Sequence, residues 1–188
     1  AQDTDVVDST FYHLVTEGPV RSIFRMHYKG WQVGEASINV DEEICIWAGK
    51  QGYGKRIKTS LLPASTSLVT GIVSNLNTQP FVEREYEKRL LGLMTHDRQT
   101  VNCNASLGMG IIVPCDNVVA VFHAPEDGMA DIRKTWCVSM KPDADGGYSY
   151  YVYAACELGD KRFRDRQEFL SMMDREAERL NHPVVVEE

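Results

Sequence analysis

The sequence predicts an α+β fold, in which an antiparallel sheet carries helices on one face. Apolar and polar residues alternate in two blocks, at about 11–47 and 101–156, and this alternation is typical of half-buried strands. Apolar residues recur at helical spacing between these blocks, at about 65–94, and after them, at about 160–181. Because strands and helices do not alternate regularly along the chain, a doubly wound parallel sheet is excluded.

The length and composition fit one domain with its own core. The chain has 188 residues, of which 43% are hydrophobic, and both values are ordinary for a globular domain. We expect a flexible acidic tail at 1–10, a single α+β domain over 11–182 and a C-terminal tail at 183–188. No stretch approaches the ~20 consecutive apolar residues of a membrane-spanning helix, so we expect no membrane span.

The first strand block predicts an antiparallel meander. Between Ile23 and Lys29, apolar residues occupy every second position, so one face of this strand is buried. Lys29–Gly30 and Asp41–Glu43 are typical turn segments, and they divide the block into successive strands that end at Trp47.

The segment at about 65–94 predicts a helical hairpin. Leu68, Ile72 and Leu76 recur at intervals of four residues, which would place them on one face of a helix. Pro80 suits the first turn of a second helix, in which acidic residues precede basic ones as the helix dipole favours.

Two further hairpins and a final helix complete the predicted fold. Strands at 108–113 and 118–122 flank turn residues, and strands at 132–140 and 148–156 flank a cluster of Asp and Gly. Asp160 then caps an amphipathic helix, which has one apolar face and one charged face.

The charge distribution argues against nucleic acid as a partner over the main surface. The chain has 20 Lys+Arg and 27 Asp+Glu, a net charge of −7, whereas phosphate binding needs clustered cations. The exception is a Gly/Lys-rich segment at 49–58. We expect this segment to be an exposed loop that binds a protein partner or an acidic ligand. Its cations are Lys50, Lys55, Arg56 and Lys58.

The same segment matches part of the phosphate-binding loop pattern G-x-x-x-x-G-K, through Gly49, Gly54 and Lys55. The Ser or Thr that should follow the lysine to hold Mg²⁺ is replaced by Arg56, and Pro63 interrupts the helix that should come next. We therefore expect no nucleotide and no other cofactor, and interpret the segment as a basic hairpin tip.

Tyrosines in the strand at 148–156 offer a second contact surface. Tyr151 and Tyr153 share one face of this strand, and Tyr148 and Tyr150 share the other. If the face with Tyr151 and Tyr153 is uncovered, its amphipathic rings are of the kind enriched in interfaces. The alternative is ordinary cross-strand pairing within the sheet.

Two histidines are candidates for acid–base chemistry. His123 ends an apolar strand beside a loop, and if the neighbouring strands pair, Cys103 or Cys115 lies near it. Such a Cys–His pair would make a thiol nucleophile. His96 is followed by Asp97, which could orient an imidazole, and the alternative interpretation of this pair is ordinary capping.

We expect no metal site, because the five histidines lack the close pairing of common zinc ligands. The segment 143–147 lacks the remaining ligands of a calcium loop and therefore predicts a hairpin turn. The odd number of cysteines leaves two alternatives, a disulfide such as Cys137 with Cys156, or buried free thiols. A chain that begins Ala1–Gln2 is typical of an exported protein after cleavage, so we expect a secreted or periplasmic location, with a trimmed cytoplasmic protein as the alternative.

These observations predict a non-catalytic binding domain. We expect it to engage a protein or an acidic ligand through a sheet surface and the basic segment 49–58, because no convergent acid–base constellation is visible in the sequence. The alternative is a small hydrolase or transferase that uses a histidine with a Cys or carboxylate partner.

Overall fold

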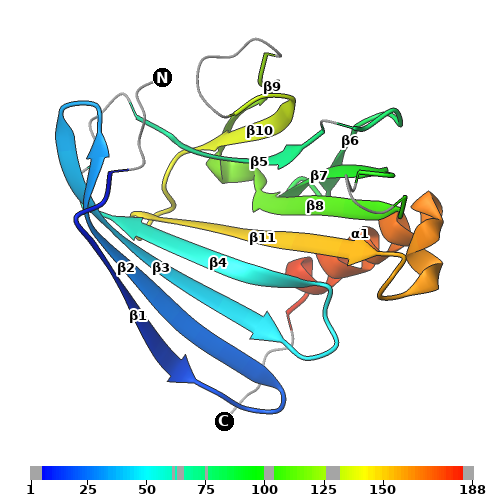
Figure 1. Cartoon of the computed structure of the whole chain (residues 1–188), viewed down its shortest axis with the longest axis horizontal. Coiled ribbons are helices and arrows are strands. Elements are labelled where there is room, and N and C mark those ends of the chain that lie inside the picture. Colours follow the sequence, from blue (N-terminus) through cyan, green and yellow to red (C-terminus); the bar gives the residue numbers. More distant parts are fainter. Residues whose placement is uncertain are drawn as a thin grey trace.

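The computed structural model describes residues 6–60, 62, 66–74, 76–99, 104–125 and 132–183. Within these ranges it contains eleven strands, two short 3-10 helices and one α-helix (Figure 1). The strands are β1 (Ser9–Thr16), β2 (Arg21–Val33), β3 (Ala36–Trp47), β4 (Gly52–Thr59), β5 (Leu68–Val73), β6 (Val82–Tyr86), β7 (Leu90–Asp97), β8 (Leu107–Pro114), β9 (Val118–His123), β10 (Thr135–Met140) and β11 (Gly147–Cys156). The helices are η1 (Cys115–Asn117), η2 (Lys161–Arg164) and α1 (Arg166–Asn181).

The strands form two antiparallel sheets. The large sheet has the order β1-β2-β3-β4-β11-β8-β7-β6, and the small sheet has the order β5-β10-β9. Every pair of neighbouring strands is antiparallel. The chain crosses repeatedly between the sheets, because β5, β9 and β10 are inserted in sequence between strands of the large sheet.

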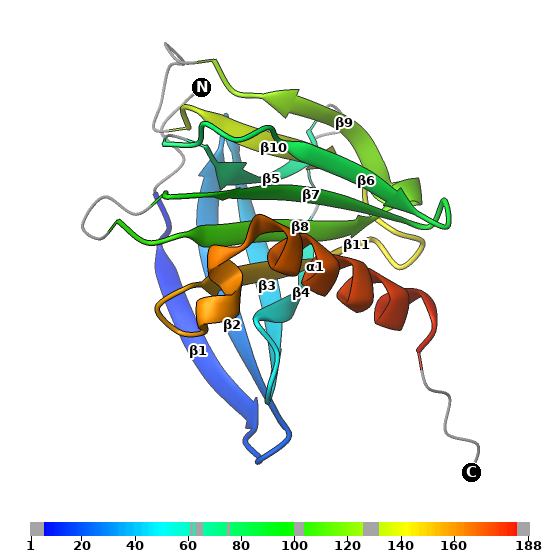
Figure 2. The same cartoon turned by 90° about the vertical axis from the view of Figure 1, so that its right-hand side faces the viewer.

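The large sheet is the middle layer of three, between the small sheet and α1 (Figure 2). Alternate side chains of β7 show this arrangement. Leu91 and Leu93 pack in the core that faces the small sheet, whereas Leu90 and Met94 pack in the core beneath α1. Both faces of this part of the large sheet are therefore buried.

The predicted α+β class is confirmed in its broad form, as a largely antiparallel protein with one C-terminal α-helix. The C-terminal helix begins later than expected. Asp160 caps the short helix η2 by accepting the Arg162 N–H at 3.0 Å, and Asp165 caps α1 by accepting the Gln167 N–H at 2.8 Å. In the described part of the chain, no helix is both long and apolar enough to cross a membrane.

The predicted helical hairpin at 65–94 is wrong, because its described residues form β5, β6 and β7. Residues four apart share a face in a strand as well as in a helix, so the spacing of Leu68 and Ile72 fits both structures. The β-branched residues of β5 favour the strand. In β7, burial on both faces removes the alternation that would otherwise identify a strand.

Two predicted hairpins are also wrong. The strands β8 and β9 lie in different sheets, and so do β10 and β11, so neither pair is hydrogen-bonded. In the first block, the meander of β1, β2 and β3 is confirmed, but two of its turns are not. The chain continues as a strand through Lys29–Gly30 and through Asp41–Glu43. Gly30 has φ of +68° and lies at a register shift, so it forms an irregularity within β2 rather than a turn.

A candidate ligand-binding cavity between the sheets

The basic segment 49–58 is not an exposed loop. Most of it is β4, which lies in the middle of the large sheet between β3 and β11. Two of its glycines, Gly52 and Gly54, provide space for aromatic rings. A Cβ atom on Gly52 would collide with the Val152 carbonyl and the Tyr153 ring, and one on Gly54 would lie 3.0 Å from the Trp47 ring. Gly49 lies in the turn before β4 with φ of +73°, whereas Gly54 and Lys55 lie within the strand, so the three residues form no phosphate-binding loop.

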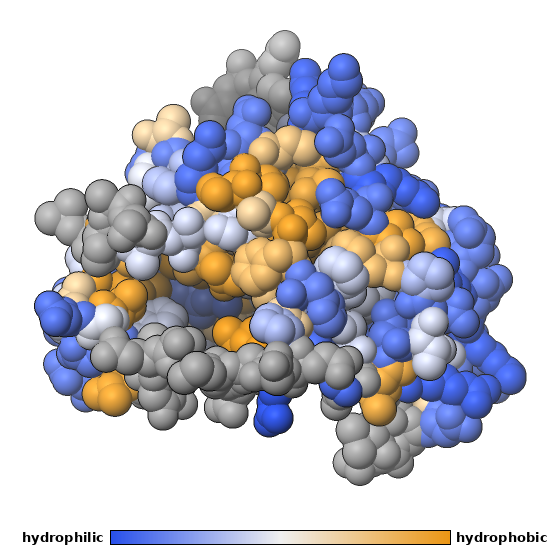
Figure 3. All heavy atoms as spheres, turned by 90° about the horizontal axis from the view of Figure 1, so that it is seen from above, coloured by the Kyte–Doolittle hydropathy of each residue, from blue (hydrophilic) through white to orange (hydrophobic). Residues whose placement is uncertain are grey.

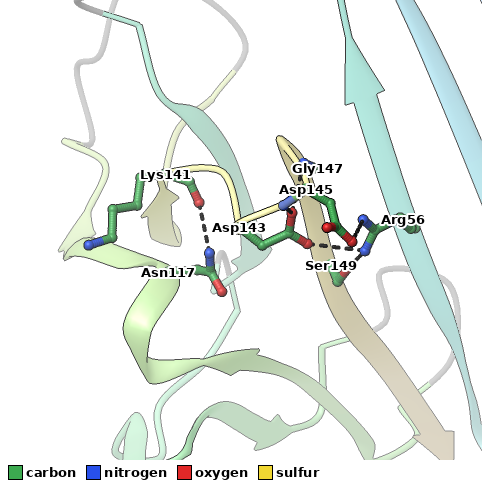
Figure 4. Close-up of polar contacts among 7 residues, drawn as sticks. All are labelled: Arg56, Asn117, Lys141, Asp143, Asp145, Gly147 and Ser149. Atoms are coloured by element: carbon green, nitrogen blue, oxygen red, sulfur yellow. Dashed lines mark hydrogen bonds and ion pairs between the residues drawn. The ribbon is translucent and has the colours of Figure 1, made fainter.

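Three of the four cations of this segment pair with carboxylates of the same chain. Arg56 illustrates the arrangement, since it donates to Ser149 at 2.9 Å and to Asp143 at 3.1 Å (Figure 4). Asp143 also accepts the N–H groups of Asp145 and Gly147, which confirms a turn at 143–147. The ion pairs are Lys50 with Glu176, Lys55 with Glu42, and Arg56 with Asp143 and Asp145. The fourth cation, Lys58, is exposed.

The ion pair of Lys55 and Glu42 lies at a cavity of about 770 Å³ between the large sheet and β5. Figure 3 shows a hollow on this side of the molecule, with hydrophobic side chains along its border. The lining is largely aliphatic and aromatic. It consists of Val7, Tyr28, Trp31, Val33, Ile38, Val40, Glu42, Lys55, Ile57, Thr59, Leu62, Thr66, Ser67, Leu68, Val69 and Tyr150.

Four polar groups meet at this cavity. Glu42, whose exposed fraction is 8%, receives a bond from Lys55 and a long one of 3.4 Å from the Tyr28 hydroxyl. The Lys55 ammonium also lies 6.0 Å from the centre of the Tyr150 ring. Alternate residues of a strand share a face, so Glu42 and Lys55 lie on the same side of the sheet as the core residues Val40 and Ile57.

The surroundings keep Tyr28, Lys55 and Tyr150 in fixed protonation states near neutral pH. Burial raises the pKa of Tyr28 and of Tyr150, so both phenols stay protonated. Burial alone would lower the pKa of Lys55, but the bond to Glu42 and the nearby Tyr150 outweigh it, so the pKa is raised. Lys55 is therefore a permanent cation in this site and not a base.

Tyr151 and Tyr153 lie on the opposite face of β11, beneath α1. Tyr153 is only 5% exposed and Tyr151 is half-buried, so the helix largely covers the face that the sequence offered as a contact surface. Both rings, with Lys50 and Glu176, line a pocket of about 200 Å³. Because Lys50 donates to both Glu176 oxygens at 2.7 Å, this pocket is part of the contact between α1 and the β3–β4 turn.

The predicted pairing of His123 with a cysteine is not formed in the described residues. Cys103 lies outside them. Cys115 precedes β9 and His123 ends it, so about 20 Å of extended chain separates the two. Burial, together with Glu85 and Asp116, raises the pKa of Cys115 and keeps it a thiol.

His123 instead contacts Ser74. Its Nε2 lies 3.1 Å from the Ser74 Oγ, and its ring stands edge-on to Trp136 at 4.8 Å. Ser74, His123 and Trp136 line a polar hollow of about 300 Å³, which we call the Ser74 hollow. Its other lining residues are Asn77, Gln79, Phe81 and Lys134.

His96 and Asp97 do not act together, because neighbouring residues of β7 point to opposite faces. His96 is 4% exposed, and its Nε2 lies 2.8 Å from the Phe163 carbonyl, to which it donates. Asp97 accepts the N–H groups of Thr78 at 2.6 Å and Gln79 at 2.9 Å. Asp97 thus accepts backbone N–H groups, as a capping residue does. These N–H groups belong to a loop, however, and not to the end of a helix.

The cysteines within the described residues are free. The disulfide offered as an example, Cys137 with Cys156, is not formed, because both of these thiols are free; Cys137 lies on β10 in the small sheet and Cys156 on β11 in the large one. Among the described residues, no three His, Cys, Asp or Glu side chains converge in a way that could hold a metal ion.

Residues 2–186 match a family described as "Domain of unknown function (DUF4861)". The chain belongs to this family. Searches of curated proteins and of solved structures find no match. The match to DUF4861 spans both sheets and α1, so the cavity between the sheets and the Ser74 hollow both lie within the family domain.

Sequence reasoning identified Lys55 but missed its partner Glu42. A signal for Glu42 was present, because it occupies an inward position in the apolar alternation of β3, after Ile38 and Val40. A charged residue on the apolar face of a strand needs a partner, and Lys55 on the neighbouring strand supplies it. The aromatic residues Tyr28 and Trp31 carried no comparable signal.

Proposed function

We propose that this DUF4861 domain is a non-catalytic binding domain that holds a small, mainly apolar ligand in the cavity between its sheets. The observation that carries the proposal is a concave space of about 770 Å³, with an aliphatic and aromatic lining and one cluster of polar groups. Such pockets, with few and convergent polar groups, are typical of small-molecule sites. Lys50, Lys55 and Arg56 are already paired with carboxylates of the chain, which favours the cavity, rather than the basic segment, as the binding site.

A bulky residue in the lining of the cavity tests this proposal. Leu68 lines the cavity from the face of β5 that packs on the large sheet, so Leu68→Trp should obstruct it. We expect the variant to weaken binding of the neutral fluorescent dye Nile red by at least about tenfold.

The matched control is Val73→Trp, which changes a 53% exposed valine of the same strand outside the cavity lining. It should bind Nile red as the wild type does. If the wild type fails to bind the dye, or if the two variants bind it equally, the cavity is not the binding site.

One observation favours a second candidate, a hydrolase that uses His123. The Ser74 Oγ lies within proton-transfer reach of His123 Nε2, at 3.1 Å. The neighbouring Lys134 has a left-handed backbone, with φ of 47°, which is a strained conformation of the kind that gathers at functional sites. Ser74 donates to the Lys134 carbonyl at 2.8 Å, so its hydroxyl must rotate to reach the histidine.

In this candidate reaction, Ser74 Oγ attacks the carbonyl carbon of an ester while its proton passes to His123 Nε2. The bond to the leaving alcohol breaks, the alcohol takes that proton, and water then releases the acid from the serine. The test is incubation with para-nitrophenyl acetate and mass spectrometry of the protein.

An acetyl group on Ser74 that is absent in Ser74→Ala and slower to form in His123→Ala would support the hydrolase. As a control, Ser149→Ala changes a serine of the large sheet that is bonded to Arg56. Release of para-nitrophenol at equal rates from the wild type and Ser74→Ala would exclude this candidate.

A further inference from the structure

We infer that the ligand in this cavity ends in an uncharged hydroxyl group, which binds between Glu42 and Lys55. The inference rests on the proposed function and adds the chemical class of the ligand. Three features support it: the two charged side chains of the lining are bonded to each other, this pair can still make hydrogen bonds to a ligand, and the rest of the lining is mainly apolar.

The described lining carries one negative and one positive side chain, and these are bonded to each other. A ligand carboxylate could reach Lys55 only by lying beside the Glu42 carboxylate. A ligand ammonium would meet Lys55 in the same way. Either ion would leave a buried charge without its partner, and an uncompensated buried charge is strongly unfavourable.

A hydroxyl group fits the remaining bonding capacity of the pair. An ammonium has three donors; Lys55 directs one at Glu42 and lies beside the Tyr150 ring, so it can donate to a further group. Among the described residues, the hydrogen bond to the Glu42 Oε2 is the long 3.4 Å one from Tyr28, so this oxygen can accept a shorter bond. One hydroxyl can donate to Glu42 and accept from Lys55, and no net charge is then buried.

The rest of the lining limits the ligand to few such groups. Val33, Ile38, Val40, Ile57 and Leu68 present only aliphatic surface to the cavity. Against this surface a sugar or another polyol would lose the hydration of most of its hydroxyls, because Thr59, Thr66 and Ser67 are the further hydroxyl residues of the described lining, and unpaired hydroxyls are costly. The ligand class is therefore an alcohol with an apolar body.

Three probes of equal chain length test the inference: octanol, octanoate and octylammonium. Each is titrated at neutral pH against the protein with Nile red bound, and the displacement of the dye is measured. Their apolar parts are the same, so differences in their displacement report the polar end. We expect octanol to displace the dye at concentrations at least about tenfold lower than either ion.

Variants of the pair should reverse this selectivity. Glu42→Gln leaves Lys55 without its carboxylate and should make octanoate the best competitor, whereas Lys55→Met should favour octylammonium. The matched control is Glu43→Gln, since Glu43 is the next residue of β3 and pairs with Arg25 on the opposite face. This control should retain the preference for octanol.

The outcomes separate the inference from the proposed function. If the wild type binds Nile red and prefers an ion, or does not discriminate among the three probes, the hydroxyl assignment is wrong and the binding cavity stands. If neither the dye nor any probe binds, the proposed function fails as well. If a variant of the pair does not fold, the wild-type comparison decides the assignment alone.

Discussion

Asp97 holds the segment before β6 in place through its carboxylate. One oxygen accepts two backbone N–H groups, from Thr78 and Gln79, and the Thr78 hydroxyl at 2.8 Å. The other accepts the Arg98 N–H at 2.7 Å. Burial alone would raise the pKa of Asp97, but these bonds to the charged form outweigh it and lower the pKa from 3.8 to about 2. The ionised carboxylate therefore stabilises the folded protein.

We predict that Asp97→Asn lowers the free energy of unfolding at neutral pH by about 1–2 kcal/mol, because charge-assisted bonds become neutral ones. The folded-state pKa lies below the unfolded value, so the contribution is present above pH 3.8 and is lost as the pH falls through about 2. Urea unfolding at several pH values measures the difference.

The difference between wild type and Asp97→Asn should shrink as the pH falls through this window. Glu35→Gln, which alters an exposed carboxylate in the β2–β3 turn, serves as the control and should have little effect. A difference that stays constant down to pH about 2 would contradict this role of the carboxylate.

At the scale of elements, α1 packs against two glycines of β8. A Cβ atom at Gly108 would collide with the Phe169 ring, and one at Gly110 would collide with the Met173 side chain. Phe169 and Met173 are both fully buried, so neither can move aside easily. The close approach of helix and sheet therefore depends on these two positions.

We predict that Gly108→Ala destabilises the protein by about 1–3 kcal/mol through overpacking against α1. Combining it with Phe169→Leu should cost less than the sum of the two single variants, because the smaller side chain makes room for the new methyl group. Urea unfolding of the three variants measures this coupling. Gly18→Ala, where a Cβ would make an ordinary 3.5 Å contact, is the control. If the losses in unfolding free energy of the two single variants simply add in the double variant, Gly108 and Phe169 do not contact each other as described.

The sequence predicted α1 correctly because this helix has one exposed and one buried face, whose helical periodicity is visible. The sequence failed at β7, where both faces are buried and the periodicity vanishes. It predicted the strands β8 to β11 but paired them wrongly, because the sheet to which a strand belongs is decided by long-range packing that local turn residues do not reveal.

At the scale of the whole molecule, the cavity exists because a small sheet faces a larger one. Over β7, β8 and β11 the two sheets are in close contact and form a continuous core, which includes Ile72, Leu93 and Val138. Over β2, β3 and β4 the space between the layers is left open. The site was partly predictable, since Lys55 was identified by its charge. Its position inside a sheet was not, because it depends on the pairing of β4 with β11.

That pairing also determines when the binding site can form. β4 ends at Thr59, and the strand that completes its hydrogen bonding begins only at Gly147. On a ribosome, the first four strands therefore emerge long before their central neighbour, and until then β4, which carries Lys55, is the edge of the sheet. Contacts between residues so far apart in sequence form slowly. The β4–β11 pairing, which brings Lys55 and Tyr150 together at the cavity, is thus among the last to form. A ligand can therefore bind only after most of the chain has been synthesised.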